Sequence, residues 1–219
     1  MVAWLMPQEL KIAVLGAGNV GGALGRIWAA AGHDVVFGVP DPQSQRVVAT
    51  LAAMKGKGRA ATNAQATAPA AVIALSVPWP AAEQAIRTAG DLRGKILIDC
   101  TNPLAADLKG LVIGLTTSAA EQVAVWAPGA KVVKAFNTIG AANFGNAQFG
   151  AQKADGFYCG DDAAAKTVVK QLIEEAGLDP VDVGPLANAR LLEPLAMLWI
   201  DLAVNQRQGA NHGFKLLRR

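Results

Sequence analysis

The chain has 219 residues, which suffice for one sizeable α/β domain with a small appendage but not for two domains of ordinary size. Hydrophobic residues make up 52% of it and charged residues 17%, which excludes a largely disordered chain. The net charge is only +3 and the basic residues are scattered, which argues against a nucleic-acid partner. We interpret Lys215, Arg218 and Arg219 as a solvated tail.

Cysteine usage and the N-terminal residues bear on the compartment. Cys100 and Cys159 lack the spacing of metal ligands, so we interpret them as small buried apolar residues. The stretch 1–10 lacks the basic start and cleavage site of a secretion signal, and no apolar run approaches the length of a membrane span. We expect a cytoplasmic protein without a metal site or membrane contact.

Strand and helix patterns alternate along the chain. Apolar runs predict strands, in chain order, over 11–15, 34–37, 72–75, 95–99, 131–135, 156–159 and 180–183. Helical patterns are predicted between them over 20–31, 44–55, 80–89, from Ser118 onward, and over 162–176 and 188–204. This alternation is typical of an α/β fold with a doubly wound, mostly parallel sheet of Rossmann type. We predict a Rossmann domain over 11–184 and a small C-terminal helical extension over 185–219 that completes an acceptor cleft.

A glycine pattern follows the first strand, in the loop Gly16-Ala17-Gly18-Asn19-Val20-Gly21. Because the loop follows a buried strand and opens a helix, it predicts a dinucleotide-binding loop rather than a turn without a ligand. We expect Gly16 to permit the tight turn, Gly18 to let a pyrophosphate approach, and Gly21 to let the helix pack closely. Asn19 and Val20 open the helix, whose N–H groups bind phosphates.

The end of the second strand normally selects the nucleotide, because an acidic residue there favours the free 2′-hydroxyl of the ribose. Asp41 lies at about the expected distance, but two prolines flank it, so it contacts the ribose or caps the following helix. Ser44 and Arg46 could instead hold a 2′-phosphate. Both NAD and NADP stay open at this point.

Three polar loops follow predicted strands and should line one cleft, because ligands bind beyond the carboxyl ends of parallel strands. We expect their residues to contact the dinucleotide, namely Ser76, Val77, Pro78, Asn102, Pro103 and Asn137. Asn137 and Thr138 are expected to position the reacting rings.

General acids and bases are scarce in these loops. His33 lies at the other end of the sheet and is interpreted as structural, and His212 lies in the C-terminal tail. Lys134 is expected to pack its stem and expose its ammonium.

Five segments together carry a resemblance, namely 14–21, 76–79, 99–104, 134–138, and 184–186 with 189–190. In these segments the chain resembles the NADPH-dependent coenzyme F420 reductase family over nearly its whole length, and the cytoplasmic reductase domain of six-transmembrane metalloreductases is similar. The resemblance implies NADP(H) on the glycine loop and a deazaflavin or flavin ring against the nicotinamide, and it favours NADP over NAD.

Two positions depart from that family. Val39-Pro40 stands where members usually carry Ser-Arg or Thr-Arg, and Asn137 stands where the archaeal deazaflavin reductases carry histidine. Arg190 matches the arginine that contacts the deazaflavin in those enzymes, and an ion pair with Glu193 on the same helix is the alternative.

The sequence predicts an NAD(P)H-dependent oxidoreductase that passes hydride to a planar acceptor such as coenzyme F420 or a flavin. Such a transfer depends on positioning, which fits the shortage of acids and bases. Leu195, Met197 and Trp199 could supply an apolar wall for the acceptor. A noncatalytic dinucleotide sensor and a small hydroxy-acid dehydrogenase are the alternatives. The apolar final helix predicts a homodimer.

Overall fold

The computed structural model describes residues 9–219. The prediction that the stretch 1–10 is not a secretion signal therefore falls largely outside the described residues. The main sheet is mixed and has the strand order β10-β9-β6-β5-β4-β1-β2-β3. The strands are β1 (Lys11–Leu15), β2 (Asp34–Gly38), β3 (Gly58–Ala61), β4 (Val72–Leu75), β5 (Ile96–Asp99), β6 (Lys131–Ala135), β9 (Asp155–Gly160) and β10 (Asp179–Asp182). Among the described residues, β6 and β9 are the one antiparallel pair within this sheet, which confirms the predicted mostly parallel sheet.

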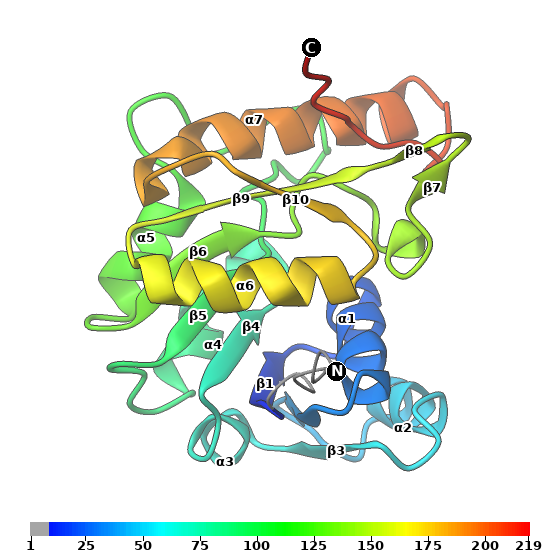
Figure 1. Cartoon of the computed structure of the whole chain (residues 1–219). Coiled ribbons are helices and arrows are strands. Elements are labelled where there is room, and N and C mark those ends of the chain that lie inside the picture. The colour runs from blue at the N-terminus through cyan, green and yellow to red at the C-terminus, as the bar shows by residue number, and fades with distance from the viewer. Residues whose placement is uncertain (1–8) are drawn as a thin grey trace, which may run out of the picture.

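Helices cover both faces of this sheet (Figure 1). One face packs against α1 (Asn19–Ala30), α2 (Gln45–Ala52) and α6 (Ala163–Glu175). The other packs against α3 (Asn63–Thr67), α4 (Ala82–Arg87), α5 (Ala119–Trp126) and the start of α7 (Ala189–Ile200). The doubly wound prediction is therefore confirmed.

Burial of the central strands explains their composition. All four residues of β4 are buried, and so is β1 from Ile12 to Leu15, because helices lie on both sides of them. The strand order reverses between β1 and β4, and a crevice opens at such a switch point beyond the carboxyl ends of the strands. The loops after these two strands begin at Gly16 and Ser76.

Some elements differ from the sequence prediction. The short edge strand β3 lacks an apolar alternation and was not predicted, although it pairs in parallel with β2. Thr62 then begins α3 with a capping box, in which its hydroxyl accepts from the Gln65 backbone N–H. A small hairpin of β7 (Gln148–Phe149) and β8 (Gln152–Lys153) was also not predicted.

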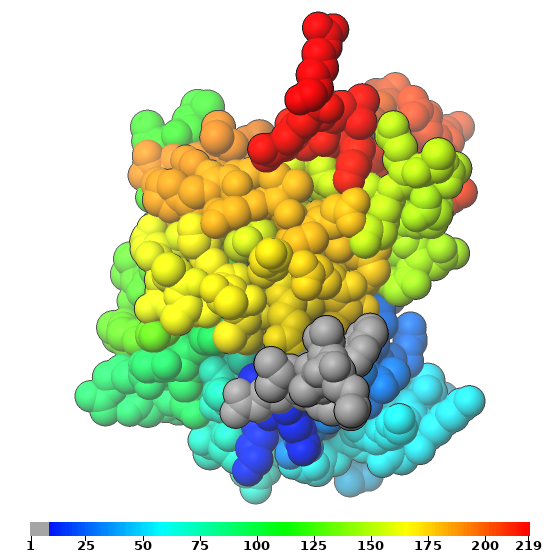
Figure 2. All heavy atoms as spheres, viewed as in Figure 1, coloured from blue at the N-terminus to red at the C-terminus, as the bar shows by residue number. Residues whose placement is uncertain are grey.

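The C-terminal segment after α7 returns to the sheet. The Lys215 ammonium lies 2.7 Å from carboxylate oxygens of both Asp155 and Asp179, so its interpretation as part of a solvated tail is wrong. In Figure 2 the last residues stand out from the body of the protein. Leu191 and Leu198 of α7 are exposed, and the homodimer through this helix stays a prediction. Among residues 9–219, no helix is long and apolar enough to span a bilayer.

Candidate functional site

The glycine loop connects β1 to α1, and its three glycines meet different surroundings. Gly16 has a φ of +99°, and a Cβ there would lie 2.9 Å from Cγ1 of Val77. A Cβ on Gly21 would overlap the carbonyl oxygen of Gly16. At Gly18, by contrast, the nearest atom to an added Cβ is Nη2 of Arg46, 3.9 Å away. The protein's own packing thus requires glycine at the first and third positions and leaves space beside the second.

The N-terminus of α1 is suited to an anion. Its N-cap residue is Gly18, which has no side chain to cap the first turn, and that turn contains no acidic residue. Unpaired backbone N–H groups and the positive end of the helix dipole attract phosphate groups. The residues that open the helix, Asn19 and Val20, line the cavity in front of it.

The largest cavity described has a volume of about 660 Å³. It extends from the glycine loop past Asn102 and Asn137 to Trp199. Two neighbouring cavities, of about 480 and 360 Å³, share Gly18 and Arg46 with it. The first of them is lined by Ser76, Val77, Pro78 and Asn102, and the second by Asp41, Ser44 and Ser76 to Pro78. The crevice therefore brings together loops that follow five different strands, β1, β2, β4, β5 and β6.

A further cavity of about 390 Å³ lies beside the end of β2 and was not predicted. Its walls are mostly apolar, and the polar residues that line it are Thr62, Asn63, Gln84 and Thr88. These residues lie on α3 and α4 or at the caps of these helices, and the unpredicted element α3 explains why the sequence did not reveal this cavity. Val77 lines both this cavity and the one beside Asp41, so the two adjoin.

Two asparagines that line the largest cavity, the buried Asn137 and the partly buried Asn102, form a hydrogen-bonded pair. The Asn137 side-chain amide donates to Oδ1 of Asn102 and to the Leu192 carbonyl oxygen, both at 3.1 Å. The Asn102 amide in turn donates to the Asn137 carbonyl oxygen. Within the described chain Oδ1 of Asn137 is buried and accepts no hydrogen bond. A buried acceptor without a donor is costly, so this atom suits a ligand N–H.

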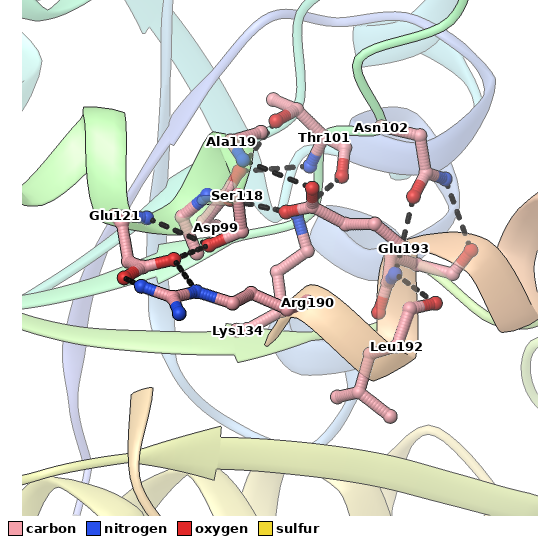
Figure 3. A network of polar contacts seen from close by, with 12 residues as sticks. Asp99, Thr101, Asn102, Ser118, Ala119, Glu121, Lys134, Arg190, Leu192 and Glu193 are labelled. Atoms are coloured by element: carbon pink, nitrogen blue, oxygen red, sulfur yellow. Dashed lines mark hydrogen bonds and ion pairs between the residues drawn. The ribbon is translucent and has the colours of Figure 1, made fainter. Parts of the chain in front are cut away.

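Behind this pair lies a buried ionic cluster, drawn in Figure 3, of Asp99, Lys134 and Glu193. The Lys134 ammonium lies 2.8 Å from Asp99 and 2.9 Å from Glu193, and it donates to the Thr101 carbonyl oxygen at 2.6 Å. Its side chain is 0% exposed, so the expected solvent-exposed ammonium is wrong. Burial by itself lowers the pKa of Lys134, but the two carboxylates outweigh it and hold that pKa above its ordinary value.

The same cluster joins three elements. Glu193 of α7 accepts from the backbone N–H groups of Ala119 and Ala120, at the first turn of α5. Because the dipole of a helix favours negative charge at its N-terminus, this carboxylate is stabilised there as well as by Lys134. The cluster therefore holds α7 in place against α5. It also holds the Leu192 carbonyl oxygen, which accepts a hydrogen bond from the Asn137 amide.

Arg190 is also held by an ion pair. Its Nε donates to Glu121 on α5 at 2.8 Å, and Glu193 faces Lys134 instead, so the alternative pairing of Arg190 with Glu193 is wrong (Figure 3). The guanidinium draws the pKa of Glu121 below its usual range. Arg190 does not line the cavities described above, and its contact with an acceptor stays a prediction.

Several other predicted residues lie behind the cavity walls. Gly21, Pro103, Thr138, Leu195 and Met197 do not line the cavities described above. Trp199 does, and its Nε1 donates to the His212 carbonyl oxygen while its ring stacks on that imidazole. The Asp41 carboxylate accepts from the Gln43 backbone N–H at 2.9 Å, in the turn before α2, rather than capping that helix.

The other ionisable residues considered in the sequence, His33 and the two cysteines, have structural surroundings. His33 bonds to the Leu10 backbone N–H and lies 2.9 Å from Glu175, which confirms its structural interpretation. Both thiols are buried, as predicted, and burial raises the pKa of Cys159 to about 12 and that of Cys100 further. Within residues 9–219 no three His, Cys, Asp or Glu side chains gather as metal ligands would.

The fold and the glycine loop define a Rossmann-type dinucleotide-binding protein, and comparisons with known proteins refine this class. Residues 11–103 match the family described as NADP oxidoreductase coenzyme F420-dependent. The F420-dependent NADP reductase of Methanothermobacter marburgensis is 32% identical over 212 residues, which cover 90% of this chain and 94% of that protein. The metalloreductase STEAP3 of Rattus norvegicus is 30% identical, and the match covers 88% of this chain but only 38% of that protein.

A solved structure is similar to this chain over nearly its whole length. A protein from Arthrobacter sp. FB24, provisionally assigned as an F420-dependent NADP reductase, superposes with a TM-score of 0.87 at 32% identity. The match covers 95% of this chain and all of that one. The chain therefore belongs to the F420-dependent NADP reductase family, which places it among the NADP-dependent oxidoreductases.

Proposed function

We propose that the protein transfers hydride between NADP(H) and a planar acceptor, either the deazaflavin coenzyme F420 or a flavin. The observation that carries this proposal is the continuous crevice that leads from the open space at Gly18 to the unpaired Oδ1 of Asn137 and on to Trp199. Its dimensions suit an extended dinucleotide followed by a second ring system.

The residues present fit each part of the dinucleotide. The mostly apolar cavity beside β2 suits the adenine, and the cavity with Ser44 and Arg46 suits a 2′-phosphate. The N-terminus of α1 suits the pyrophosphate. Oδ1 of Asn137 suits the N–H of the nicotinamide carboxamide, so it would fix the orientation of that ring.

The chain's own contribution to catalysis is positioning. When bound, NADPH supplies the hydride and the acceptor ring receives it. Among the described residues that line the largest cavity, the ionisable ones are Arg26, Arg46 and Cys100, whose thiol is neutral. None of these described residues offers a carboxylate, imidazole or ammonium as a general base. Trp199 and Ile200 form an apolar wall that would exclude water from the acceptor ring. This lining favours transfer between two rings over hydroxy-acid dehydrogenation.

The test is to mix the purified protein with NADPH and coenzyme F420 or FMN, and to follow oxidation of NADPH by absorbance. We expect turnover with at least one of these acceptors. Tight binding of NADPH without turnover of any acceptor would contradict the proposal and identify the noncatalytic sensor instead. Turnover of small hydroxy acids alone would identify the dehydrogenase.

Replacement of Arg46 by alanine should weaken binding of NADPH and leave NADH nearly unchanged. Arg46 lies at the start of α2, beside the open space at Gly18, and makes no ion pair within the described residues. A charge-assisted hydrogen bond to a phosphate contributes about 1.5–3 kcal/mol, so the Kd of NADPH should rise about 10- to 100-fold. Fluorescence titration with both nucleotides measures this change.

The control is Arg87→Ala, which removes an exposed arginine that pairs with Glu83 on α4. It should leave both affinities unchanged. Equal losses for NADPH and NADH in Arg46→Ala, or a wild-type protein that prefers NADH, would show that Arg46 does not read the 2′-phosphate and that Asp41 contacts the ribose.

A further inference from the structure

The largest cavity continues beyond the asparagine pair and the glycine loop. One of its walls is a face of α1, because Asn19, Gly22, Ala23 and Arg26 recur at helical spacing and all line it. Arg26 lies two turns, about 10 Å along the helix axis, beyond Asn19. The cavity thus has an outer part, at Arg26, that is separate from the N-terminus of α1 where a pyrophosphate would bind.

Small residues keep this outer part open. Its lining next to α1 includes Ala141, Ala142 and Ala210, and the loop and tail that carry them are joined where Asn143 donates to the Ala210 carbonyl oxygen at 2.9 Å. On α1 itself, a Cβ at Gly22 would reach only ordinary van der Waals contact, 3.4 Å from Cγ2 of Thr50. Packing of α1 therefore does not require the absence of a side chain at this position.

The charge of the outer part is positive. Arg26 is exposed and makes neither a hydrogen bond nor an ion pair with another side chain in the described part of the protein. No aspartate or glutamate lines the cavity, and its other arginine, Arg46, lies beside Gly18. A planar guanidinium in a groove without carboxylates suits phosphate or carboxylate groups.

We propose that Arg26 binds the phosphate or carboxylate groups of the acceptor's side chain in the outer part of the cavity. This inference rests on the proposed hydride transfer to a planar acceptor. With the ring held between Asn137 and Trp199, a side chain that leaves toward α1 passes Gly22 and Ala23 and reaches Arg26. Arg26 would then select among acceptors by charge without touching the reacting atoms.

The experiment compares acceptors that share a ring and differ in side-chain charge. FMN carries a phosphate that riboflavin lacks, and coenzyme F420 carries phosphate and carboxylate groups that its bare deazaflavin chromophore lacks. We expect Arg26→Gln to raise the KM of the charged member of the pair that the wild type uses by about 10- to 100-fold. The KM of the uncharged member, the KM of NADPH and kcat should stay near their wild-type values.

A matched control is Lys170→Gln, which removes the same charge from an exposed position of α6 that does not line the cavity. It should change no KM. An Arg26→Gln protein with unchanged KM for the charged acceptor, or with equal increases for both members of a pair, would overturn the inference. Wild-type protein that reduces no member of either pair would instead overturn the proposed function.

Discussion

Replacement of Gly18 by valine should abolish nucleotide binding while the fold survives. An added Cβ at this position meets no protein atom closer than the flexible tip of Arg46 at 3.9 Å, and φ is not positive there. The valine side chain would instead occupy the space through which a pyrophosphate approaches the N–H groups of α1. We expect no measurable affinity for NADPH by calorimetry, together with circular dichroism and a melting temperature close to those of the wild type.

Gly114→Val provides the matched control, because an added Cβ at Gly114 also meets no atom within 4 Å and this residue lines none of the cavities described. It should bind NADPH normally. By contrast, valine at Gly16 or Gly21 should destabilise the protein itself, since the added atoms would meet Val77 or overlap the backbone. A folded Gly18→Val protein that binds NADPH as tightly as the wild type would remove the basis of the dinucleotide site.

Replacement of Lys134 by methionine should destabilise the protein by about 3–5 kcal/mol, the usual cost of removing one partner from a buried ion pair. Asp99 and Glu193 are 0% and 1% exposed, so both carboxylates would lose their cation in a place that water does not reach. Such a loss is a large part of the stability of an ordinary domain. The midpoint of urea unfolding measures it.

Two further variants identify the cause. Lys153→Met removes a lysine whose partner Asp179 is 40% exposed, so it should cost less than about 1 kcal/mol. Adding Glu193→Gln to Lys134→Met should restore part of the lost stability, because one buried charge is then absent. A Lys134→Met protein as stable as Lys153→Met would show that the cluster contributes no net stability.

The direction in which the pKa of Lys134 is shifted also determines the pH range over which the ionic cluster stabilises the protein. The folded-state pKa is raised, so the stabilisation is fully present below the unfolded pKa of lysine, about 10.4, and is lost only as the pH rises through the folded value. The difference between wild type and Lys134→Met should therefore be constant across the neutral range and shrink only in strong alkali.

Local patterns predicted most of the fold. The first strand–helix–strand unit follows from its apolar runs and glycine loop, because each feature acts within a few residues. The convergence of Ser76, Asn102 and Asn137 on one crevice follows from a general rule about the carboxyl ends of parallel strands. The edge strand β3 was missed because its four residues, Gly58 to Ala61, carry no apolar alternation and are specified by pairing with β2.

The burial of Lys134 was not predictable in the same way. Its partner Asp99 lies 35 residues away on a neighbouring strand, and Glu193 comes from the last helix. A lysine in the strand sequence Lys131 to Ala135 has the same local pattern whether its ammonium meets water or two carboxylates. The pairing of β5 with β6 places Asp99 beside Lys134, and the docking of α7 against the N-terminus of α5 supplies the second carboxylate.

The docking of α7 against α5 also has a consequence for the order in which the two halves of the crevice form during synthesis. A ribosome completes every strand of the sheet, and the glycine loop with it, before it synthesises Glu193 and Trp199. Until then, Lys134 has Asp99 alone as its anionic partner in the cluster, and the first turn of α5 lacks the carboxylate of Glu193. We therefore expect a nascent chain to gain the dinucleotide half of its crevice first, and to acquire the acceptor half only when its final helix leaves the exit tunnel.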